Sequence, residues 1–449
     1  MKIQGMRWLI LSLIVLVTII NILDRGTLNY MWQDGKDKTT GLVIQRGIAS
    51  ELHIINDGMS AEEQQQKSKE AFAWINITFM LAYGVSQLVS GAMYDRVGTR
   101  KGFTISALIW GGAIALTSIV TGVKQLAFFR VMLGLGEAGP WPGTTKSNAE
   151  WFPIKERAIA QGFFGAASSL GNILVPVIIP LLFLSYGWRA TFVILGVICL
   201  LWIPLWMLVN KASMQNHPWV TETEKEYILN GQTEQPSAES KHIGISALVR
   251  DKKSYSVILS RFFLDPIWWM FMTWLPIYLQ EVYQLNLQDV AAVAWIPFVG
   301  AAIGSLTGGW WAGKLISKGM PALKARKTTI AIGGALIVPG MIGAAFAPTG
   351  LSASIMLMLI LGGFQFAMTN IQTLPSDFHS GKTVGTLAGL GGAAAVLGIV
   401  ISTYLVPILT QSGSWIPFFA MGLLLIPLSI SSIFVFSPKN KNKITNNDY

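Results

Sequence analysis

The sequence is poor in charge and contains one cysteine. Asp, Glu, Lys and Arg make up 12% of the 449 residues, hydrophobic residues make up 52%, and the mean hydropathy is +0.50. So little charge cannot cover a water-soluble protein of this length, whereas lipid accepts apolar side chains. Cys199 lies in an apolar run, which excludes an intramolecular disulfide and a thiolate metal site. We therefore expect a membrane protein and not a large hydrophobic soluble enzyme.

Signals for catalysis, metal binding and nucleotide binding are also missing. None of the four histidines has another metal ligand at a usual spacing, and no nucleophile elbow or zinc-protease motif occurs. Residues 308–314, Gly-Gly-Trp-Trp-Ala-Gly-Lys, approach a phosphate-binding loop but lack the hydroxyl residue that holds magnesium. We expect no cofactor, no metal and no enzymatic activity, which leaves ion gradients as the energy source.

Apolar segments long enough to cross a bilayer, about 20 residues in a helix, are abundant. Twelve of them follow one another, at residues 8–31, 71–94, 102–122, 125–146, 157–184, 188–210, 256–281, 288–312, 327–347, 351–374, 383–409 and 414–436. The first, preceded by Lys2 and Arg7, has no small-residue cleavage site before Asp24, so we interpret it as an uncleaved span. The predicted fold class is an all-α membrane protein with twelve transmembrane helices.

Two polar insertions interrupt this series. The loop at about 211–255 separates six spans from six, which predicts an N-terminal bundle at 1–210 and a C-terminal bundle at 256–449. The insertion at about 32–70 carries charge of both signs and is interpreted as a small external elaboration. Spans five and eleven are both rich in glycine and end near a proline, as expected for a duplicated bundle.

Lysine and arginine gather in alternate loops, and this pattern predicts the orientation. The loops after spans two and eight, the start of span five and the C-terminal tail are basic. The opposite loops carry Lys124, Arg189 and almost nothing else outside the mixed-charge insertion. Both termini are therefore expected in the cytoplasm. The net charge of +10 reflects this topology and does not indicate a nucleic-acid-binding surface.

Four charged residues fall inside spans of the first half. Asp24 and Arg25 lie in span one; Arg130 and Glu137 lie in span four, on one helical face and roughly 10 Å apart. Such groups are unfavourable in hydrocarbon unless they are paired or face a cavity. One interpretation gives Arg25 and Arg130 to a substrate anion and gives Asp24 and Glu137 to protons. The alternative is that ion pairs among them only tie span one to span four.

Aromatic and neutral polar residues complete the candidate substrate site. Tyr83 in span two either donates its hydroxyl into a cavity or packs in the core. In the second half, Arg261 opens span seven and is interpreted as snorkelling to the cytoplasmic surface, and Trp268 follows it. Asn370 and Gln372 in span ten either bind sugar hydroxyls or hold helices together. On this interpretation the second half offers only neutral polar groups and aromatics.

The loop between spans two and three resembles the signature loop of the major facilitator superfamily. It reads Gly91-Ala-Met-Tyr-Asp95-Arg96-Val-Gly-Thr-Arg100-Lys101. The glycine permits close helix contact, and the acid with its basic cluster can form a cytoplasmic latch against a neighbouring helix end. This assigns the latch role to Gly91, Asp95, Arg96 and Arg100. The corresponding loop after span eight has Gly313 where an acid is expected, so the second copy is degenerate.

Within that superfamily the chain resembles the anion:cation symporters, most closely the bacterial hexuronate transporters. The likeness rests on Asp24-Arg25, Arg130 with Gly136-Glu137-Ala138, the segment Trp151 to Arg157, the segment Tyr227 to Gln232, and Trp274-Leu-Pro276-Ile-Tyr278. The resemblance implies two six-helix bundles and proton-coupled import of sugar acids by alternating access. It makes Arg25 the carboxylate anchor, Tyr83 a cavity ligand, and Asp24 and Glu137 the proton sites.

The expected function is import of a hexuronate such as glucuronate or galacturonate, with protons, across the bacterial inner membrane. The expected partners of this monomer are a small organic anion, protons and the lipid bilayer. One alternative is a symporter for an aldonate, an aldarate or an aromatic acid, and another is a sugar-acid sensor that signals through the loop at 211–255. The segment 391–395, Gly-Gly-Ala-Ala-Ala, stands where some sugar-acid relatives place an asparagine, which leaves the sugar-hydroxyl contacts open.

Overall fold

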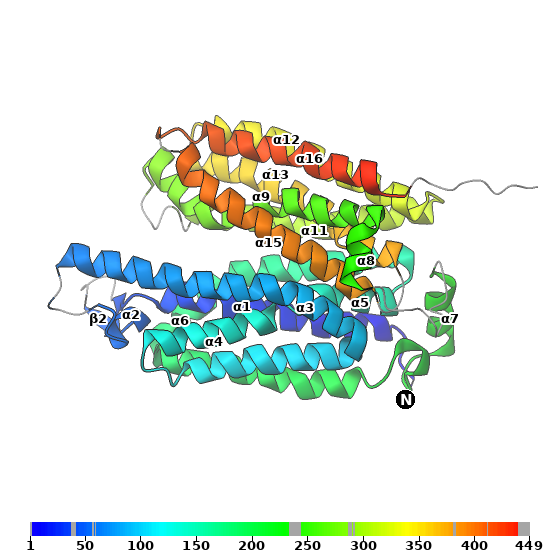
Figure 1. Ribbon diagram of the computed structural model, residues 1–449, viewed down its shortest axis with the longest axis horizontal. Coiled ribbons are helices and arrows are strands. Elements are labelled where there is room, and N and C mark those ends of the chain that lie inside the picture. Colours follow the sequence, from blue (N-terminus) through cyan, green and yellow to red (C-terminus); the bar gives the residue numbers. More distant parts are fainter. Residues whose placement is uncertain are drawn as a thin grey trace, which may run out of the picture.

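The computed structural model describes residues 2–36, 42–55, 58, 60–232, 244–285, 290, 292–379, 383–410 and 412–438. Most of these residues are helical (Figure 1). The longer helices of the first half are α1 (Met6–Met31), α3 (Ala61–Thr117), α4 (Val123–Glu137), α5 (Pro140–Trp151) and α6 (Ile154–Val209). Those of the second half are α9 (Tyr255–Tyr283), α11 (Ile296–Ser317), α12 (Ala322–Ala345), α13 (Gly350–Ile371), α15 (Val384–Leu409) and α16 (Ile416–Phe436).

The described helices account for twelve membrane spans, which confirms the predicted fold class. Helices α3 and α6 hold two spans each, because the chain turns at Gly98 and Gly187, whose φ angles are 80° and 79°. Positive φ is readily adopted only by glycine, so these two residues allow tight reversals between spans. Spans four and ten are each made of two helices, α4 with α5 and α13 with the short α14 (Leu374–Phe378). By length and hydropathy alone, seven of the helices in the described residues qualify as spans, and α3 and α6 are among them.

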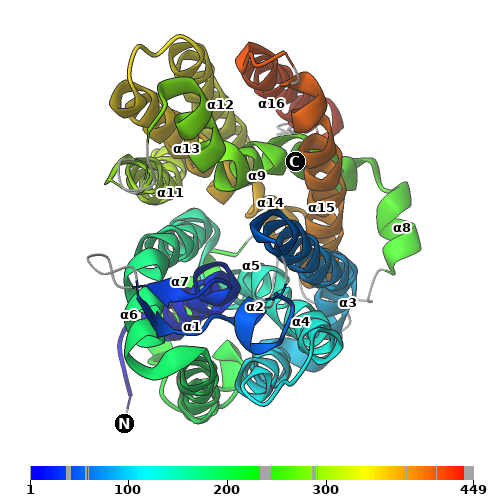
Figure 2. The same ribbon diagram turned by 90° about the vertical axis from the view of Figure 1, so that its left-hand side faces the viewer.

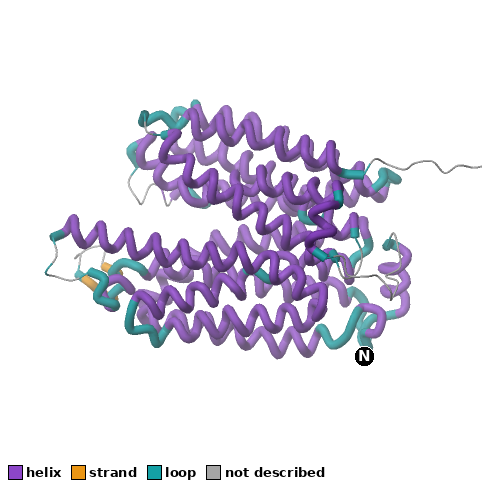
Figure 3. The backbone as a smooth tube through the Cα atoms, viewed as in Figure 1, coloured by secondary structure: helices purple, strands orange, loops and turns teal. Residues whose placement is uncertain are grey.

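The spans form two bundles with separate hydrophobic cores (Figures 1 and 2). Helices α1 and α3 to α6 surround one core, and α9 and α11 to α16 surround the other. Between the bundles, α3 packs against α15 and α6 packs against α11. We call the end of the molecule where α1 begins and α16 ends the terminal face, and the other end the opposite face (Figures 1 and 3).

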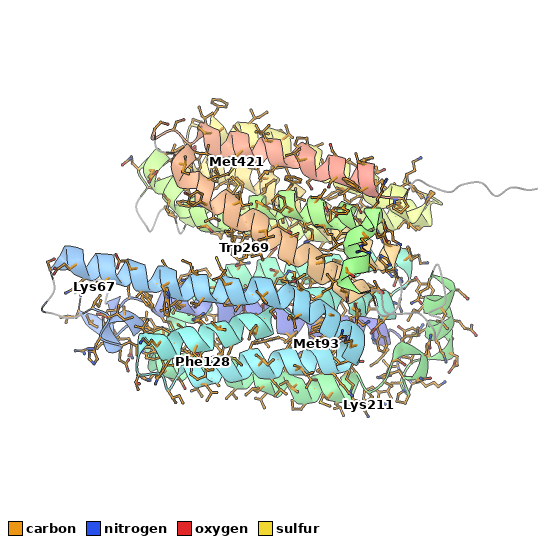
Figure 4. The ribbon with its side chains drawn as sticks, in the orientation of Figure 1. Lys67, Met93, Phe128, Lys211, Trp269 and Met421 are labelled. Atoms are coloured by element: carbon orange, nitrogen blue, oxygen red, sulfur yellow. The ribbon has the colours of Figure 1, made fainter. Side chains whose placement is uncertain are left out.

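The outer surface of the two bundles is largely apolar between the two ends of the molecule. Large apolar side chains stand on it, such as Phe128, which is 59% exposed. Exposed lysines mark the two ends of the molecule, Lys211 toward the terminal face and Lys67 toward the opposite face (Figure 4). A belt of exposed apolar side chains between charged ends is the pattern of a membrane-spanning protein.

The described residues of the first insertion pack on the opposite face. Strands β1 (Gly35–Lys36) and β2 (Val43–Gln45) pair antiparallel, and α2 (Ile48–Glu51) follows them. Ile48 is fully buried, and Glu51 accepts hydrogen bonds from Trp188 Nε1 at 2.5 Å and Arg189 Nε at 2.7 Å on α6. The elaboration is therefore fastened to the first bundle. Residues 37–41, 56, 57 and 59 of the predicted insertion lie outside the described residues.

The central loop is held at the terminal face by the start of the chain. Its helices are η1 (Met214–Asn216), α7 (Glu222–Asn230), α8 (Ile245–Arg250) and η2 (Lys252–Ser254). Glu224 of α7 accepts hydrogen bonds from the backbone N–H groups of Gly5 and Met6, at 2.9 and 3.0 Å. A carboxylate at a helix N-terminus satisfies otherwise unpaired N–H groups and complements the helix dipole, so Glu224 caps α1. Residues 233–243 and the basic tail 439–449 lie outside the described residues.

Candidate functional site

An ion pair between α1 and α4 lies at the centre of the candidate site. Arg25 Nε donates to Glu137 Oε2 at 3.0 Å, and Arg25 Nη2 donates to Asn21 Oδ1 at 3.4 Å. The Glu137 side chain is fully buried, whereas the Arg25 side chain is 20% exposed. A guanidinium has five N–H donors in a planar fork. Arg25 therefore has donors left, on its exposed side, for an anion.

Three aromatic rings surround the Arg25 guanidinium. Its carbon lies 5.0 Å from the ring centroid of Tyr83, 5.1 Å from that of Trp141 and 5.9 Å from that of Phe79. Within about 6 Å, the face of an aromatic ring attracts a cation. These rings fix the plane of the guanidinium, so its free donors point in a defined direction.

Asp24 and Arg130 lie deeper in the same bundle. Asp24 is fully buried and Arg130 is 4% exposed. In the described part of the chain, both carboxylate oxygens of Asp24, Glu137 Oε1 and Arg130 Nη2 are buried without a hydrogen-bond partner. Arg130 interacts electrostatically with both acids. Buried polar atoms without partners are rare in proteins. The group is thus a set of carboxylates and cations with unused bonding capacity inside the membrane.

The local sequence around Glu137 explains how α4 brings this carboxylate close to α1 and α3. A Cβ on Gly134 would lie 2.6 Å from the backbone oxygen of Phe79, and one on Gly136 would lie 2.6 Å from the backbone nitrogen of Trp110. Only glycine permits such contact with the two halves of α3. Helix α4 ends at Glu137, and Pro140 begins α5, because proline favours the first turn of a helix.

The sequence-predicted residues of the second half make contacts with protein groups. Trp268 packs on Phe364, with ring centroids 5.6 Å apart. Asn370 is fully buried and donates from Nδ2 to the backbone oxygen of Gly308 on α11 at 3.1 Å. Gln372 Oε1 accepts from Gln161 Nε2 of the first bundle at 2.6 Å. In this conformation Asn370 and Gln372 hold helices together.

The interpretation of Arg261 as a snorkelling residue is wrong. Its side chain is 9% exposed, and Nε donates to Asp265 Oδ2 at 2.9 Å. The head group stays in the interior because a carboxylate one helical turn away compensates its charge. The inference that the second half offers only neutral polar groups and aromatics is therefore also wrong.

Asp95 connects the two bundles at the terminal face. It accepts hydrogen bonds from the backbone nitrogens of Gly385 at 3.0 Å and Thr386 at 2.6 Å, at the N-terminus of α15. Lys146 Nζ lies 3.1 Å from the same carboxylate. A Cβ on Gly91 would lie 2.3 Å from the backbone oxygen of Gly385, so glycine is required for this contact.

The other two predicted latch residues lie apart from this contact. Arg96 is exposed, and Arg100 donates to the backbone oxygen of Met207 on α6, at 3.3 Å, within its own bundle. The cation beside Asp95 is Lys146, which sequence reasoning missed. The feature that could have indicated Lys146 in the sequence is its position at the end of an apolar span.

A second cluster of ion pairs joins the two bundles, and its acid takes the place of the one missing from the degenerate second copy of the signature loop. Asp377 of α14 pairs with Arg326 Nε at 3.0 Å and lies 3.8 Å from Arg157 Nη1 of α6. Arg157 donates to the backbone oxygen of Ser376 at 2.6 Å, and Arg326 donates to that of Ile154 at 2.8 Å. The carboxylate that is missing at position 313 is thus supplied by Asp377 of α14, which follows α13.

These contacts close the molecule at the terminal face. Toward the opposite face, the axes of the two bundles diverge (Figures 1 and 3). Arg25 lies 19 residues after the start of α1, about 28 Å along the helix, and so on the side where the bundles separate. The candidate site is therefore sealed on one side by the two ionic clusters.

We predict that Asp95→Asn opens the terminal face. Removing one partner of a buried ion pair costs about 3–5 kcal/mol, which corresponds to roughly a hundredfold or greater change in population. Spin labels at Lys101 and Lys318, exposed on opposite bundles, should show a longer distance in the variant. Buried Cys199 does not compete for label. Glu222→Gln, on a side chain that is 69% exposed, is the control, and an unchanged distance distribution in Asp95→Asn would contradict the prediction.

Known proteins with similar sequences are transporters. The family model of the Major Facilitator Superfamily matches residues 14–390. The hexuronate transporter of Escherichia coli (strain K12) is 30% identical over 427 residues, which cover 94% of this chain and 91% of that protein. The galacturonate transporter of Dickeya chrysanthemi is 29% identical over 346 residues, which cover 76% and 92%.

Solved structures share the architecture. A Major Facilitator Superfamily transporter, FucP, solved in the outward conformation, superimposes with a TM-score of 0.66 at 14% identity. The match covers 96% of this chain and 99% of that one. At this identity the likeness establishes the fold and nothing finer.

Proposed function

Because the chain belongs to the Major Facilitator Superfamily, we propose that it is a secondary active transporter that imports a hexuronate with protons. The substrate is a sugar acid such as glucuronate or galacturonate, as in the relatives named above. The observation that carries this proposal is the Arg25–Glu137 pair, in which a partly exposed guanidinium with free donors is held against a buried carboxylate.

Arg25 binds the carboxylate of the substrate. Its planar fork matches a carboxylate in two parallel hydrogen bonds, and its aromatic surroundings exclude water. The positive charge of Arg130, deeper in the bundle, attracts anions to the pocket. Tyr83 directs its hydroxyl toward the bound sugar acid. Gln372 becomes a sugar contact when the bundles move and its partner Gln161 in the first bundle separates from it. Trp268 and Asn370 stay packed within the second bundle and support the sugar-binding surface.

Asp24 and Glu137 carry the protons. Both are buried in the same cluster as Arg25 and have unpaired carboxylate oxygens among the described residues. Histidine is less suited to this role here. Burial and the neighbouring Lys253 lower the pKa of His379 to about 4, and burial also lowers the pKa of His217, so both stay neutral in the physiological range.

Transport proceeds by alternating access between the two faces. The terminal face is cytoplasmic by its excess of lysine and arginine, so the closed clusters at Asp95 and Asp377 make this conformation outward-facing in the bacterial inner membrane. A substrate that enters from the opposite face meets Arg25 before it reaches those clusters. One chain supplies both bundles and the whole site, which is consistent with a working monomer.

A panel of sugar acids tests the substrate class. Purified protein is expected to gain thermal stability with glucuronate or galacturonate, since a ligand present at 100 times its Kd adds about 2.7 kcal/mol to the free energy of unfolding. Aldonates and aromatic acids are the competing classes in this test, and gluconate and benzoate represent them. Stabilisation by benzoate with none by any hexuronate would contradict the proposal, and so would the absence of labelled glucuronate uptake by proteoliposomes under an inward pH gradient.

A further inference from the structure

The buried Arg261–Asp265 pair on α9 has no part in the site described so far. The pair is closed by a 2.9 Å hydrogen bond, and the two side chains are 9% and 12% exposed. Among the described residues, the guanidinium also donates from Nη1 to the backbone oxygen of Ala388, at 3.4 Å. An ion pair inside a membrane protein is commonly less stable than an apolar pair of the same volume. Its presence calls for a role other than stability.

Two glycines of α15 make room for this arginine. A Cβ on Gly391 would lie 3.2 Å from Arg261 Cδ, and one on Gly392 would lie 3.3 Å from Arg261 Nη1. Gln87 of α3 approaches the same place from the first bundle, 2.4 Å from the Gly392 Cβ position. The Gln87 Oε1 atom is buried and has no hydrogen-bond partner among the described residues. Arg261 thus lies where polar atoms of both bundles have unused hydrogen-bonding capacity.

Two aromatic residues connect Arg261 to Arg25. Trp141, whose ring lies 5.1 Å from the Arg25 guanidinium, also borders a narrow gap that Arg261 and Gln372 line from the second bundle. Tyr83, 5.0 Å from Arg25, interacts electrostatically with Arg261 as well. The two arginines, one from each bundle, therefore both lie near Trp141, and both interact electrostatically with Tyr83.

This arrangement suits a ligand with an anionic group at each end. Each arginine is neutralised by one carboxylate of its own bundle, Glu137 or Asp265, and each has N–H donors to spare. A second carboxylate on the ligand gains a charge-assisted hydrogen bond at Arg261, whereas a neutral hydroxyl gains a weaker one.

We propose that Arg261 and Asp265 form a second anion subsite, which receives the end of a sugar acid remote from the carboxylate bound at Arg25. The subsite accepts the second carboxylate of a six-carbon dicarboxylic sugar acid, an aldarate. This inference rests on the proposed function and extends its substrate class to dicarboxylates. Because Arg25 and Arg261 belong to different bundles, a ligand that bridges them also draws the bundles together.

Competition uptake in proteoliposomes tests the subsite. The measurement is the ratio of the inhibition constants of galactarate and gluconate, a dicarboxylate and a monocarboxylate, against labelled glucuronate uptake. In the unmodified protein, galactarate is expected to compete at least as strongly as gluconate. In the double variant Arg261→Gln/Asp265→Asn, the ratio is expected to shift tenfold or more against galactarate. The double variant removes both charges together and so leaves no unpaired charge in the membrane.

Two further variants separate a binding role from a packing role. Arg261→Lys keeps a charge but loses the planar fork, and a smaller shift in the same direction is expected. Arg250→Gln, on an exposed arginine of α8, is the matched control and should leave the ratio unchanged. A ratio within twofold of the unmodified value in the double variant would overturn the subsite, and so would an unmodified protein that galactarate does not inhibit. Failure of the proposed function is a different result, namely no glucuronate uptake by the unmodified protein.

Discussion

Arg25→Ala is expected to abolish sugar-acid uptake. The substitution removes the fork that binds the substrate carboxylate and leaves Glu137, fully buried, without its cation. Truncating one partner of a buried hydrogen-bonded charge pair costs about 2–5 kcal/mol, which corresponds to a roughly 30-fold to several-thousandfold weaker affinity. Uptake of labelled glucuronate and its counterflow in proteoliposomes should both fall to the level of empty liposomes.

Two controls separate loss of binding from loss of folding. Arg25→Lys keeps the charge but not the planar fork, so it should retain weak uptake with a strongly raised KM. Arg250→Gln changes an exposed arginine and should transport normally. If Arg25→Ala transported glucuronate with a KM within twofold of the unmodified value, Arg25 would not be the carboxylate anchor.

Glu137→Gln is expected to uncouple uptake from the proton gradient. Glutamine can still accept the hydrogen bond from Arg25 Nε but cannot take up and release a proton in the transport cycle. One pH unit is worth about 1.36 kcal/mol, so each coupled proton supports roughly tenfold accumulation per unit of gradient. In the variant, the accumulation driven by an inward pH gradient should fall to equilibration, while exchange of labelled for unlabelled substrate continues.

The comparison of driven uptake with exchange makes this second test specific. A misfolded variant loses both activities, whereas an uncoupled one loses only the first. Asp24→Asn changes the other buried acid of the cluster and should also reduce driven uptake more than exchange. Uphill accumulation by Glu137→Gln at the level of the unmodified protein would show that Glu137 is not an obligatory proton carrier.

Most of the fold could be predicted from the sequence because span length and apolar composition are local properties. The twelve apolar segments correspond to the observed spans, including the pairs that Gly98 and Gly187 separate within α3 and α6. The intramembrane charges were also informative, since Asp24, Arg25, Arg130 and Glu137 meet in one bundle. A charge inside an apolar run is visible in one sequence because its unfavourable burial demands an explanation.

What the sequence left undetermined are partners far apart along the chain. Asp95 bonds the start of α15, 290 positions away, and Asp377 pairs with Arg157, which opens α6. No local pattern reveals such pairs, because they depend on how the two bundles dock. Arg261 was misinterpreted for a related reason. Its place near a span end suggested snorkelling, but the glycines that admit it to the interior lie on another helix.

The small elaboration at the opposite face provides a means to follow the motion of the transporter. Its α2 helix is fastened to α6 through Glu51, Trp188 and Arg189, so an antibody fragment raised against it would follow the first bundle as a rigid extension. In electron cryo-microscopy such a fragment provides an alignment mark outside the detergent micelle. Its angle to the second bundle would then distinguish the conformations in a mixed population of particles.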